Sequence, residues 1–541
     1  MATLTQQEIT DWLNKPSAIR GCLVEVGVRL KNDTVDSVRY LSSFNYTTDT
    51  TSTAADSDHG IIPANMGYEA VVVGGFKYTE RLDYTGGIST SLSVGDIELN
   101  NANGEYDSWL LDYWSNRPIK IYLGDPSWSR DKFFLVFSGV VDDIDSRTIG
   151  ALNIKIKDKL ARLNTPVSEL KLSDVAPYPD VTNISPVHDP LDPLDNVPDI
   201  FLPVTLGEVH NITPVLIDPV NLVYITNYGS IAGIIEVRDQ GVPLPITSYT
   251  ATDAKGVFRL LFQPAGVITC SIQGDNIGAY RNTPGSIIKN LVKNYGKTVP
   301  DAVTGAPTLT PSPDRFSDSD IDLTNFSAFE TLNTQPVGVF VNARENLLSI
   351  AQQLAGSVGA QVSMSRLGKL RLLSIVSQPT GSFYGIYNDD MVAKTFQISA
   401  RTNIQGSVKL GFCKNWTKQD QLLTNLPYEH KVLFSEDYST IVVADAATIS
   451  KYSLTTYPPQ QDTLLLTQPT ANIEAERRLA MYKEPHTVYR FTGFSNLLDL
   501  ELGSVVKLHY PRFGLDLGKL GTVVSLTPDW INSKVVVEVF I

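Results

Sequence analysis

Apolar side chains alternate with polar ones through most of residues 88–157, and this alternation constrains the fold more than any other feature of the chain. A period of two places apolar side chains on one face of a strand and polar ones on the other. The pattern predicts strands at 92–99, 119–123, 133–141 and 152–156. Asn103-Gly104, a pair that favours positive φ, predicts a hairpin turn after the first strand. Four antiparallel strands with tight turns predict a small barrel or sandwich.

The flanking segments predict further short elements. Thr5 and Glu8 have capping-box spacing and predict a helix over 5–13 that stops before Pro16. Residues 22–30 alternate as a strand, whereas 46–59 are rich in Thr, Ser, Asp and Ala and predict a mobile loop. Apolar runs between 204 and 274 are separated by turns with Gly, Asn or Pro, and they predict a second all-β region.

The pattern then changes to a helical period. Thr283 as N-cap, Pro284 at the first helical position and Gly296 as terminator predict a helix. A proline-rich linker is expected at 299–313 and a short helix around Phe326. Further predictions are a helix over 347–354 with Asn342 and Glu345 as its capping box, a hairpin over 362–372, a helix from Thr470 to Glu484, and strands at 504–508, 521–526 and 534–541.

Changes in composition divide the chain into four predicted domains. Prolines and aspartates crowd residues 165–203 and exclude a regular helix or sheet, which indicates a boundary after Asn164. The predicted domains are a barrel-like 1–164, a β-rich 165–282, a helix-plus-hairpin 283–399 and a C-terminal β-domain 400–541. The predicted fold class is α+β, predominantly β and multidomain.

Charge and cysteine content exclude several classes of function. The formal charge of −14 disfavours a dedicated nucleic-acid binder, which would cluster Lys and Arg against phosphates. If the protein formed a channel through which DNA slides, its net negative charge would instead keep the DNA from adhering to it. Cys22, Cys270 and Cys413 lie far apart and match neither a disulfide framework nor a zinc site, which fits folding inside a cell. We expect neither an export signal nor a membrane span.

Three acidic clusters and one glycine pattern are the candidate chemical sites, and each has a simpler structural interpretation. Asp189, Asp192 and Asp195 could ligate calcium, but Asp-Pro pairs are ordinary turns. Asp318, Asp320 and Asp322 begin like a calcium loop, but Leu323 and Phe329 stand where its Gly and Glu belong. Asp142, Asp143 and Asp145 could form a carboxylate pair for glycan cleavage, although exposed acids at a strand end are commoner. Gly514, Gly518 and Lys519 imitate a phosphate loop with one residue too few and Leu520 in place of the hydroxyl.

Other enzyme motifs do not match. The sequence contains no GxSxG, HExxH or CxxC motif, and its six histidines are scattered. We therefore predict no catalytic, cofactor-binding or metal-binding residues and no enzymatic activity.

Several motifs nevertheless resemble those of a known family, the tail-tip or baseplate hub proteins of tailed bacteriophages. The resemblance touches all four regions in the same order and is most specific in 345–373. The similar segments are 93–101, 104–107, 117–125, 137–144, 207–214, 345–373, 414–417 and 498–506.

This resemblance implies a function and an assembly. In the family, two barrel-like tube-type domains per subunit alternate around a homotrimer and form a pseudo-sixfold ring; here they would be the N-terminal and C-terminal regions. The implied partners are the distal tail protein and tail tube, the tape-measure protein, a fibre, spike or cap protein, and DNA in transit. The implied location is the virion tail tip. Some relatives hold an iron–sulfur cluster, which this chain lacks the clustered cysteines to bind.

Two alternatives stay open. A β-rich receptor-binding adhesin would show a stalk or repeats, and no repeat period is found. A glycan hydrolase would depend on Asp142 and Asp143, whose substitution tests that hypothesis.

Overall fold

The chain forms two compact units, each built from segments that lie far apart in the sequence. The structure is a computed structural model that describes all residues except 1–3, 16, 51–52, 55–60, 63, 86–92, 176–199, 305–306, 421, 423–425 and 457. Unit 1 comprises Met1–Arg162, Ser363–Asn403 and Pro485–Ile541, and unit 2 comprises Leu163–Val362 and Ile404–Glu484. Strands predominate over helices in the described residues as a whole, which confirms the predicted α+β, mainly β class.

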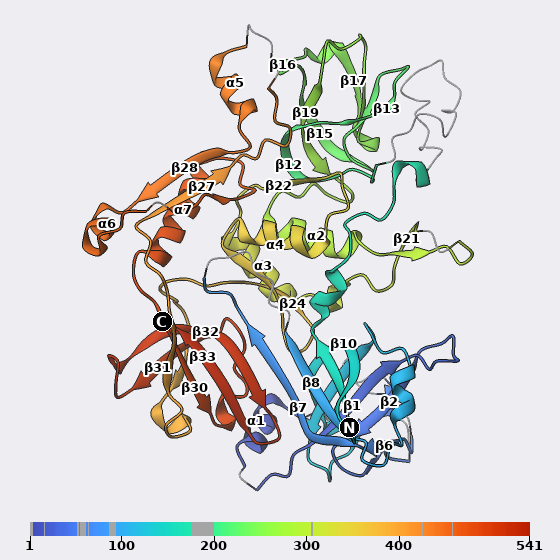
Figure 1. Ribbon diagram of the computed structural model, residues 1–541, viewed down its shortest axis with the longest axis vertical. Coiled ribbons are helices and arrows are strands. Elements are labelled where there is room, and N and C mark those ends of the chain that lie inside the picture. Colours follow the sequence, from blue (N-terminus) through green and yellow to red (C-terminus); the bar gives the residue numbers. More distant parts are fainter. Residues whose placement is uncertain are drawn as a thin grey trace. The chain divides into compact units, whose positions relative to one another are not determined.

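Unit 1 is almost entirely β-structure (Figure 1). Its elements are α1 (Gln6–Leu13), β1 (Gly21–Val28), β2 (Ser37–Ser42), β3 (Tyr46–Thr47), β4 (Thr53–Ala54), β5 (Ile61–Ile62), β6 (Gly67–Ala70), β7 (Val72–Arg81), β8 (Val94–Asn100), β9 (Pro118–Gly124), β10 (Phe134–Thr148), β11 (Ala151–Lys157), β24 (Leu370–Ser374), β25 (Tyr384–Ile386), β26 (Gln397–Arg401), β30 (Thr487–Gly493), β31 (Val505–Tyr510), β32 (Leu515–Asp529) and β33 (Lys534–Phe540). The boundary with unit 2 falls within β23 (Ala360–Met364), which forms a hairpin with β24.

One large sheet organises unit 1. Its strand order is β26-β30-β33-β32-β7-β8-β11-β10-β9-β1-β2-β6-β3, with β31 also on β32 and β25 on β31. The N-terminal and C-terminal strands share one apolar core, in which Ile121, Ile154 and Val537 are fully buried. Within the described residues the two end strands do not pair, so the hydrogen-bonded path is open and closed barrels stay a prediction.

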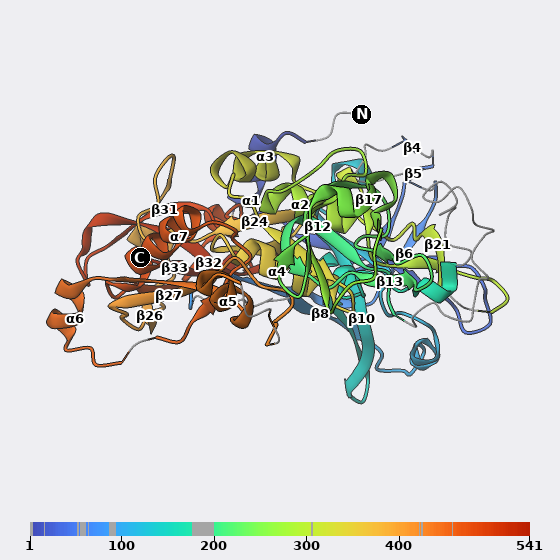
Figure 2. The ribbon, with the colours of Figure 1, turned by 90° about the horizontal axis from the view of Figure 1, so that it is seen from above.

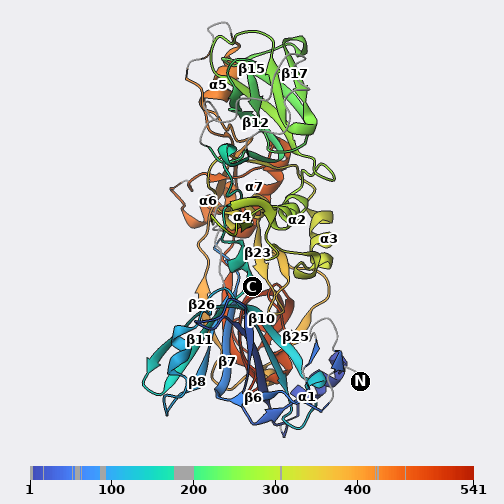
Figure 3. The ribbon, with the colours of Figure 1, turned by 90° about the vertical axis from the view of Figure 1, so that its right-hand side faces the viewer.

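Unit 2 combines small sheets with helices (Figure 3). Its elements are β12 (Val204–Ile212), β13 (Val215–Asp218), β14 (Val223–Ile225), β15 (Ile231–Asp239), β16 (Val242–Pro243), β17 (Tyr249–Thr252), β18 (Val257–Leu260), β19 (Ile268–Asp275), α2 (Pro284–Asn294), β20 (Thr298–Pro300), β21 (Pro307–Pro311), α3 (Leu323–Leu332), β22 (Gly338–Val341), α4 (Leu347–Gly356), β27 (Ser407–Phe412), α5 (Tyr428–Ser435), β28 (Ser439–Ala444), α6 (Ala446–Tyr452), β29 (Gln461–Asp462) and α7 (Gln468–Tyr482).

Three sheets of unit 2 position its helices. The orders are β16-β15-β19-β12-β22, β13-β14-β18-β17 and β28-β27-β29. Helices α2 and α4 pack together, and α2 buries Ile287, Ile288 and Leu291, which are the apolar positions that predicted it. The predicted second all-β region is confirmed and consists of two sheets. Its strand β12 also pairs with β22, although α2 and α3 lie between these two strands in the sequence.

Most predictions that depended on local pattern are confirmed. The Thr5–Glu8 capping box begins α1, and β9, β10 and β11 match the predicted strands, although β10 continues to Thr148. The structure also confirms the helix over 284–294, the helix around Phe326, the hairpin after α4 and the three C-terminal strands. Residues 46–59, predicted as a mobile loop, contain β3 and part of the β4–β5 pair, and 51–52 and 55–59 lie outside the described residues.

Two turn predictions are wrong. Asn103-Gly104 joins no hairpin, because β8 pairs with β7 and β11. The Asn101 amide donates to Asp107 over 2.7 Å, and the chain turns there into a short 3-10 helix that buries Trp109. The proline-rich segment 299–313 is also no linker, because β20 and β21 pair within it. Prolines are tolerated there because both strands of a two-stranded hairpin are edges.

Two capping predictions are also wrong. Helix α4 is capped by Asn346, whose side chain accepts from the Ser349 amide over 3.1 Å, and not by Asn342 with Glu345. Helix α7 begins after its N-cap Thr467 rather than at Thr470, and Pro469 lies in its first turn, where the missing N–H of a proline costs no helical hydrogen bond. Helix α7 ends at Tyr482, two residues before the predicted Glu484.

Candidate functional site

The three aspartates considered for glycan cleavage lie on β10 of unit 1. Asp142 is paired with Lys157 at 2.8 Å and Asp145 with Lys155 at 2.7 Å, both lysines coming from the adjacent β11. Asp143 stands opposite Lys155 in the register of the two strands and is exposed. The structure thus engages Asp142 and Asp145 in cross-strand ion pairs at the surface of a sheet.

The acidic turn at 318–322 is used locally. Asp318 is paired with Lys293 at 2.8 Å, Asp320 accepts from the Ser317 amide at 3.1 Å, and Asp322 caps α3 through the Asn325 amide at 3.0 Å. Among the described residues, no group of three or more His, Cys, Asp or Glu side chains could hold a metal ion. Asp189, Asp192 and Asp195 lie outside the described residues.

The glycines that imitate a phosphate loop are turn residues. Gly514 and Gly518 have φ of 68° and 76°, the left-handed region that glycine adopts without strain. Lys519 pairs with Leu508 in the β31–β32 ladder. The pattern is therefore explained by the turn and bend of a strand.

Unit 1 has two sheet edges that no other described strand covers. Strand β9 pairs with β10 only from Phe134 to Val140, and no described strand pairs with 142–148 on the side away from β11. We call this segment the β10 overhang. The strand β10 is labelled in Figure 2. Ile149, which directly follows the β10 overhang, is fully exposed. Such an edge offers unpaired backbone groups to another chain.

A second uncovered edge belongs to the C-terminal strands. Among the described strands, β26 pairs only with β30, and its Ile398 is 49% exposed. Strand β25 pairs only with β31 and is flanked by exposed Phe383 and Tyr387. Exposed apolar residues on an edge strand are a liability in a monomer, because they favour pairing with other chains.

An ion pair with a buried guanidinium links the N-terminal strands. The Arg130 guanidinium is almost fully buried, donates to the Glu25 carboxylate at 2.6 Å and lies over the Tyr122 ring at 3.7 Å. Tyr68 donates its hydroxyl to the same carboxylate at 2.7 Å. Burial, together with the negative charge of Glu25, raises the pKa of Tyr68 well above its ordinary value. This cluster ties β1, β6 and the loop before β10 together.

A second buried polar group occupies the junction of β7 and β32. Glu80 is 4% exposed, and its carboxylate accepts a long hydrogen bond from Tyr78 at 3.3 Å. Asp158 is 1% exposed and accepts from the amides of Ser93 and Leu160 at 2.8 and 3.0 Å. Burial raises the pKa of Glu80 and of Asp158 to about 7 in each case.

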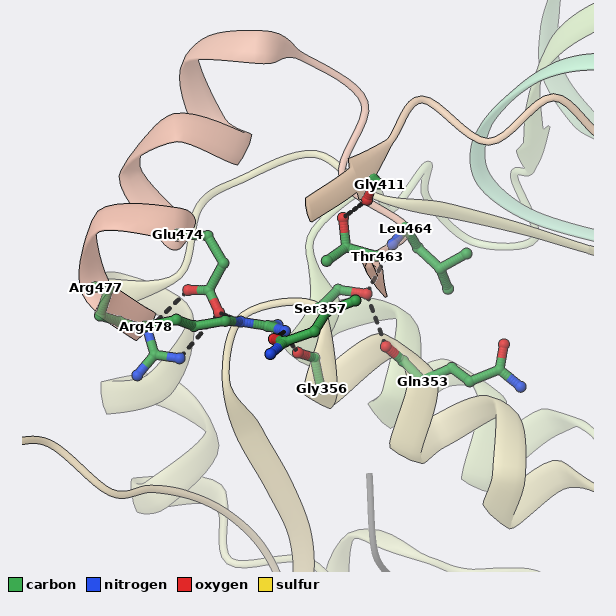
Figure 4. A network of polar contacts seen from close by, with 10 residues as sticks. Gln353, Gly356, Ser357, Gly411, Thr463, Leu464, Glu474, Arg477 and Arg478 are labelled. Atoms are coloured by element: carbon green, nitrogen blue, oxygen red, sulfur yellow. Dashed lines mark hydrogen bonds and ion pairs between the residues drawn. The ribbon is translucent and has the colours of Figure 1, made fainter. Parts of the chain in front are cut away.

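In unit 2, helix α7 carries a polar network against the end of α4 (Figure 4). Glu474 accepts from Arg477 at 2.7 Å and from Arg478 at 2.6 Å. Arg478 also donates to the Gly356 carbonyl at 2.6 Å, and Ser357 donates to the Gln353 carbonyl and accepts from the Leu464 amide. Arg478 thus adds a side-chain donor to a carbonyl at the end of α4, which also accepts from the Gly359 amide at 3.1 Å.

Sequence reasoning missed Glu80, Asp158, Glu25 and Arg130. The sequence did contain a sign that Glu80 is buried. Alternate residues of a strand share one face, and Phe76, Tyr78 and Leu82, which share the face of Glu80, are all buried. Nothing local distinguishes Glu25 or Arg130 from surface charges, because their partners come from other strands.

None of the helices in the described part of the chain is both long and apolar enough to cross a membrane.

No family model and no curated protein matches the chain. Among solved structures, it is similar to the 43-kDa tail protein of prophage MuSo2 from Shewanella oneidensis, with 12% identity, 88% of this chain and 96% of that chain covered, and a TM-score of 0.34. A tail protein from Neisseria meningitidis MC58 shows 9% identity, 86% and 91% coverage, and a TM-score of 0.36. A chain from the virion of a native gene transfer agent shows 13% identity, 64% and 85% coverage, and a TM-score of 0.39. These three structures are described as tail or virion proteins.

Proposed function

We propose that the chain is a structural hub at the distal end of a bacteriophage tail, where it forms a homotrimeric ring that continues the tail tube. The observation that carries this proposal is the pair of uncovered edges in unit 1, the β10 overhang and β26. Unpaired edges are normally blunted or covered, and copies of the same chain are the simplest cover. Closed rotational symmetry satisfies identical interfaces without growth into a fibre.

The two halves of the unit 1 sheet would take alternating positions in the proposed ring. The N-terminal strands β1–β11 and the C-terminal strands β26–β33 of unit 1 would form the two barrel-like modules that alternate around the axis. The four regions 1–164, 165–282, 283–399 and 400–541 would be the building blocks of the subunit. The ring would let DNA pass during ejection, and the formal charge of −14 would limit sticking of the DNA.

The proposed partners follow from this position. The hub would contact the distal tail protein and tail tube on one side, the tape-measure protein within, and a fibre, spike or cap protein on the other side. Its place would be the tail tip of the virion. The role is mechanical, and we propose no reaction, cofactor or metal for it.

The proposal is tested by the mass and the negative-stain image of the purified chain. A threefold ring of three chains with a central hole is expected. Ile398→Lys should weaken the ring, because a lysine on an edge strand opposes pairing. Val94→Lys is the matched control: Val94 is 59% exposed, but β8 is paired on both sides.

A compact monomer with a ligand-binding cleft would contradict the hub and favour the adhesin. A ring that withstands Ile398→Lys as well as Val94→Lys would leave the hub intact but remove β26 from its interface.

A further inference from the structure

The two halves of the unit 1 sheet are joined by a short strand pairing, which we call the seam. It consists of Arg81 opposite Ser525 and Glu80 opposite Leu526. The Leu82 amide donates to the Val524 carbonyl at 2.8 Å, and the hydroxyls of Thr79 and Thr527 lie 3.0 Å apart. In the described residues, no other strand pairing links β1–β11 with β26–β33. The strands β7 and β32 can be followed in Figure 1.

The side chain of Glu80 is buried at this seam without a strong partner. Its backbone carbonyl accepts from the Ser525 hydroxyl at 3.1 Å, while its carboxylate has the 3.3 Å bond from Tyr78. The Glu80 side chain also lines a small cavity with Arg366, Arg371 and Glu501. Both arginines are engaged elsewhere: Arg371 binds Glu501 at 2.5 Å, and Arg366 donates to the Leu498 and Leu500 carbonyls.

Burial disfavours the ionised form of Glu80. It has the largest effect on the pKa of Glu80 and raises it, as Glu501 and Asp158 also do, whereas Arg366 and the hydrogen bond from Tyr78 lower it. Burial also raises the pKa of Tyr78 well above its ordinary value, and the charges of Glu80 and Asp158 act in the same direction. A buried carboxyl without a salt bridge is more stable when it is neutral.

We infer that the seam is a proton-linked joint, which is closed when Glu80 is protonated and loosened when Glu80 ionises. The pKa of Glu80 in the folded chain, about 7, lies above its ordinary value of 4.5, so the folded seam holds the proton more tightly. Its stabilising contribution is therefore complete below about pH 4.5, is lost as the pH rises to about 7, and stays absent above that. Asp158 acts in the same direction, from its ordinary value of 3.8 to about 7.

The inference predicts a measurable change in local opening. Between pH 5.5 and 8.5, ionisation of Glu80 should lower protection of the seam amides roughly 30-fold, because a shift of this size favours the opened, ionised form to that extent. Amides of β1 and β9, which lie away from the seam, should change much less. This effect is independent of whether the chain forms a trimeric hub.

Native-state hydrogen exchange of the full chain tests the inference, with rates corrected for the intrinsic pH dependence of exchange. Peptides that cover residues 79–82 and 524–527 should lose protection in the wild type. Glu80→Gln keeps a neutral group of the same shape and should reduce that loss at least tenfold. Glu98→Gln, on an exposed position of β8, is the matched control and should lose protection like the wild type.

Two results would overturn the inference. One is a wild-type seam whose corrected protection is the same at both pH values. The other is a Glu80→Gln variant whose loss of protection equals that of the Glu98→Gln control.

Discussion

Removal of the Arg478 guanidinium is expected to destabilise unit 2 more than any change to its neighbour Arg477. The Arg478 side chain is 10% exposed and makes three hydrogen bonds of 2.6 Å, to Glu474, Gln461 and the Gly356 carbonyl. Arg478→Ala removes one of the two donors to the Gly356 carbonyl, which keeps the Gly359 amide at 3.1 Å, and takes one of two cations from the buried Glu474. The substitution therefore affects α7, β29 and the end of α4 together.

The expected loss in the free energy of unfolding depends on the contacts that Glu474 keeps after the substitution. Breaking a buried ion pair by removing one partner costs about 3–5 kcal/mol. Glu474 keeps Arg477 at 2.7 Å, so we expect the lower end of that range, about 3 kcal/mol. Arg477→Ala is the matched control, because Arg477 binds the same carboxylate from the same helix but its side chain is 33% exposed. Its cost should be about 1 kcal/mol, as for surface ion pairs.

Denaturant-dependent hydrogen exchange of peptides from α4 and α7 measures both values. The expected result is faster opening of the last turn of α4 in Arg478→Ala than in Arg477→Ala. Equal opening free energies for the two variants would refute the view that Arg478 holds the helices together.

Two further substitutions test other parts of the fold. Arg130→Met should cost about 3 kcal/mol, the lower end for a buried pair, because it leaves the Glu25 carboxylate, which is 19% exposed, without its cation. Adding Glu25→Gln should recover part of the loss; urea unfolding of the single and double variants measures this, and an unaffected single variant would contradict it. Gly207→Ala should cost on the order of 3 kcal/mol, because Gly207 has φ of 73° and an added Cβ would lie 2.1 Å from the Val337 carbonyl oxygen. Gly233→Ala, where a Cβ meets nothing within 4 Å, should stay within about 0.5 kcal/mol of the wild type, and equal melting temperatures for the two variants would disprove the steric argument.

Sequence patterns predicted the elements whose cause is local. Helix α2 follows from Thr283, Pro284 and its apolar face, and β9 follows from its alternation. The two capping errors arose where a neighbouring residue could serve equally well as the N-cap. Asn346 rather than Asn342 caps α4, and Thr467 rather than Thr470 precedes α7, because the two candidates in each case have similar chemistry within one turn.

The sequence could not reveal pairings between distant segments. The seam joins Glu80 to Leu526, and the alternation that predicts both strands contains no information about their partners. The same holds for the β10 overhang, because a strand is an edge only through the absence of a neighbour. The parity of Glu80 with Phe76, Tyr78 and Leu82 was the one available sign of a buried acid, and it became interpretable only with the core in view.

A reconstruction of the assembled particle tests the proposed role most directly. It should show three copies of this chain around the tail axis at the distal end, with the β10 overhang and β26 covered by neighbouring chains. A position away from the axis, or a copy number unrelated to three, would contradict the proposal.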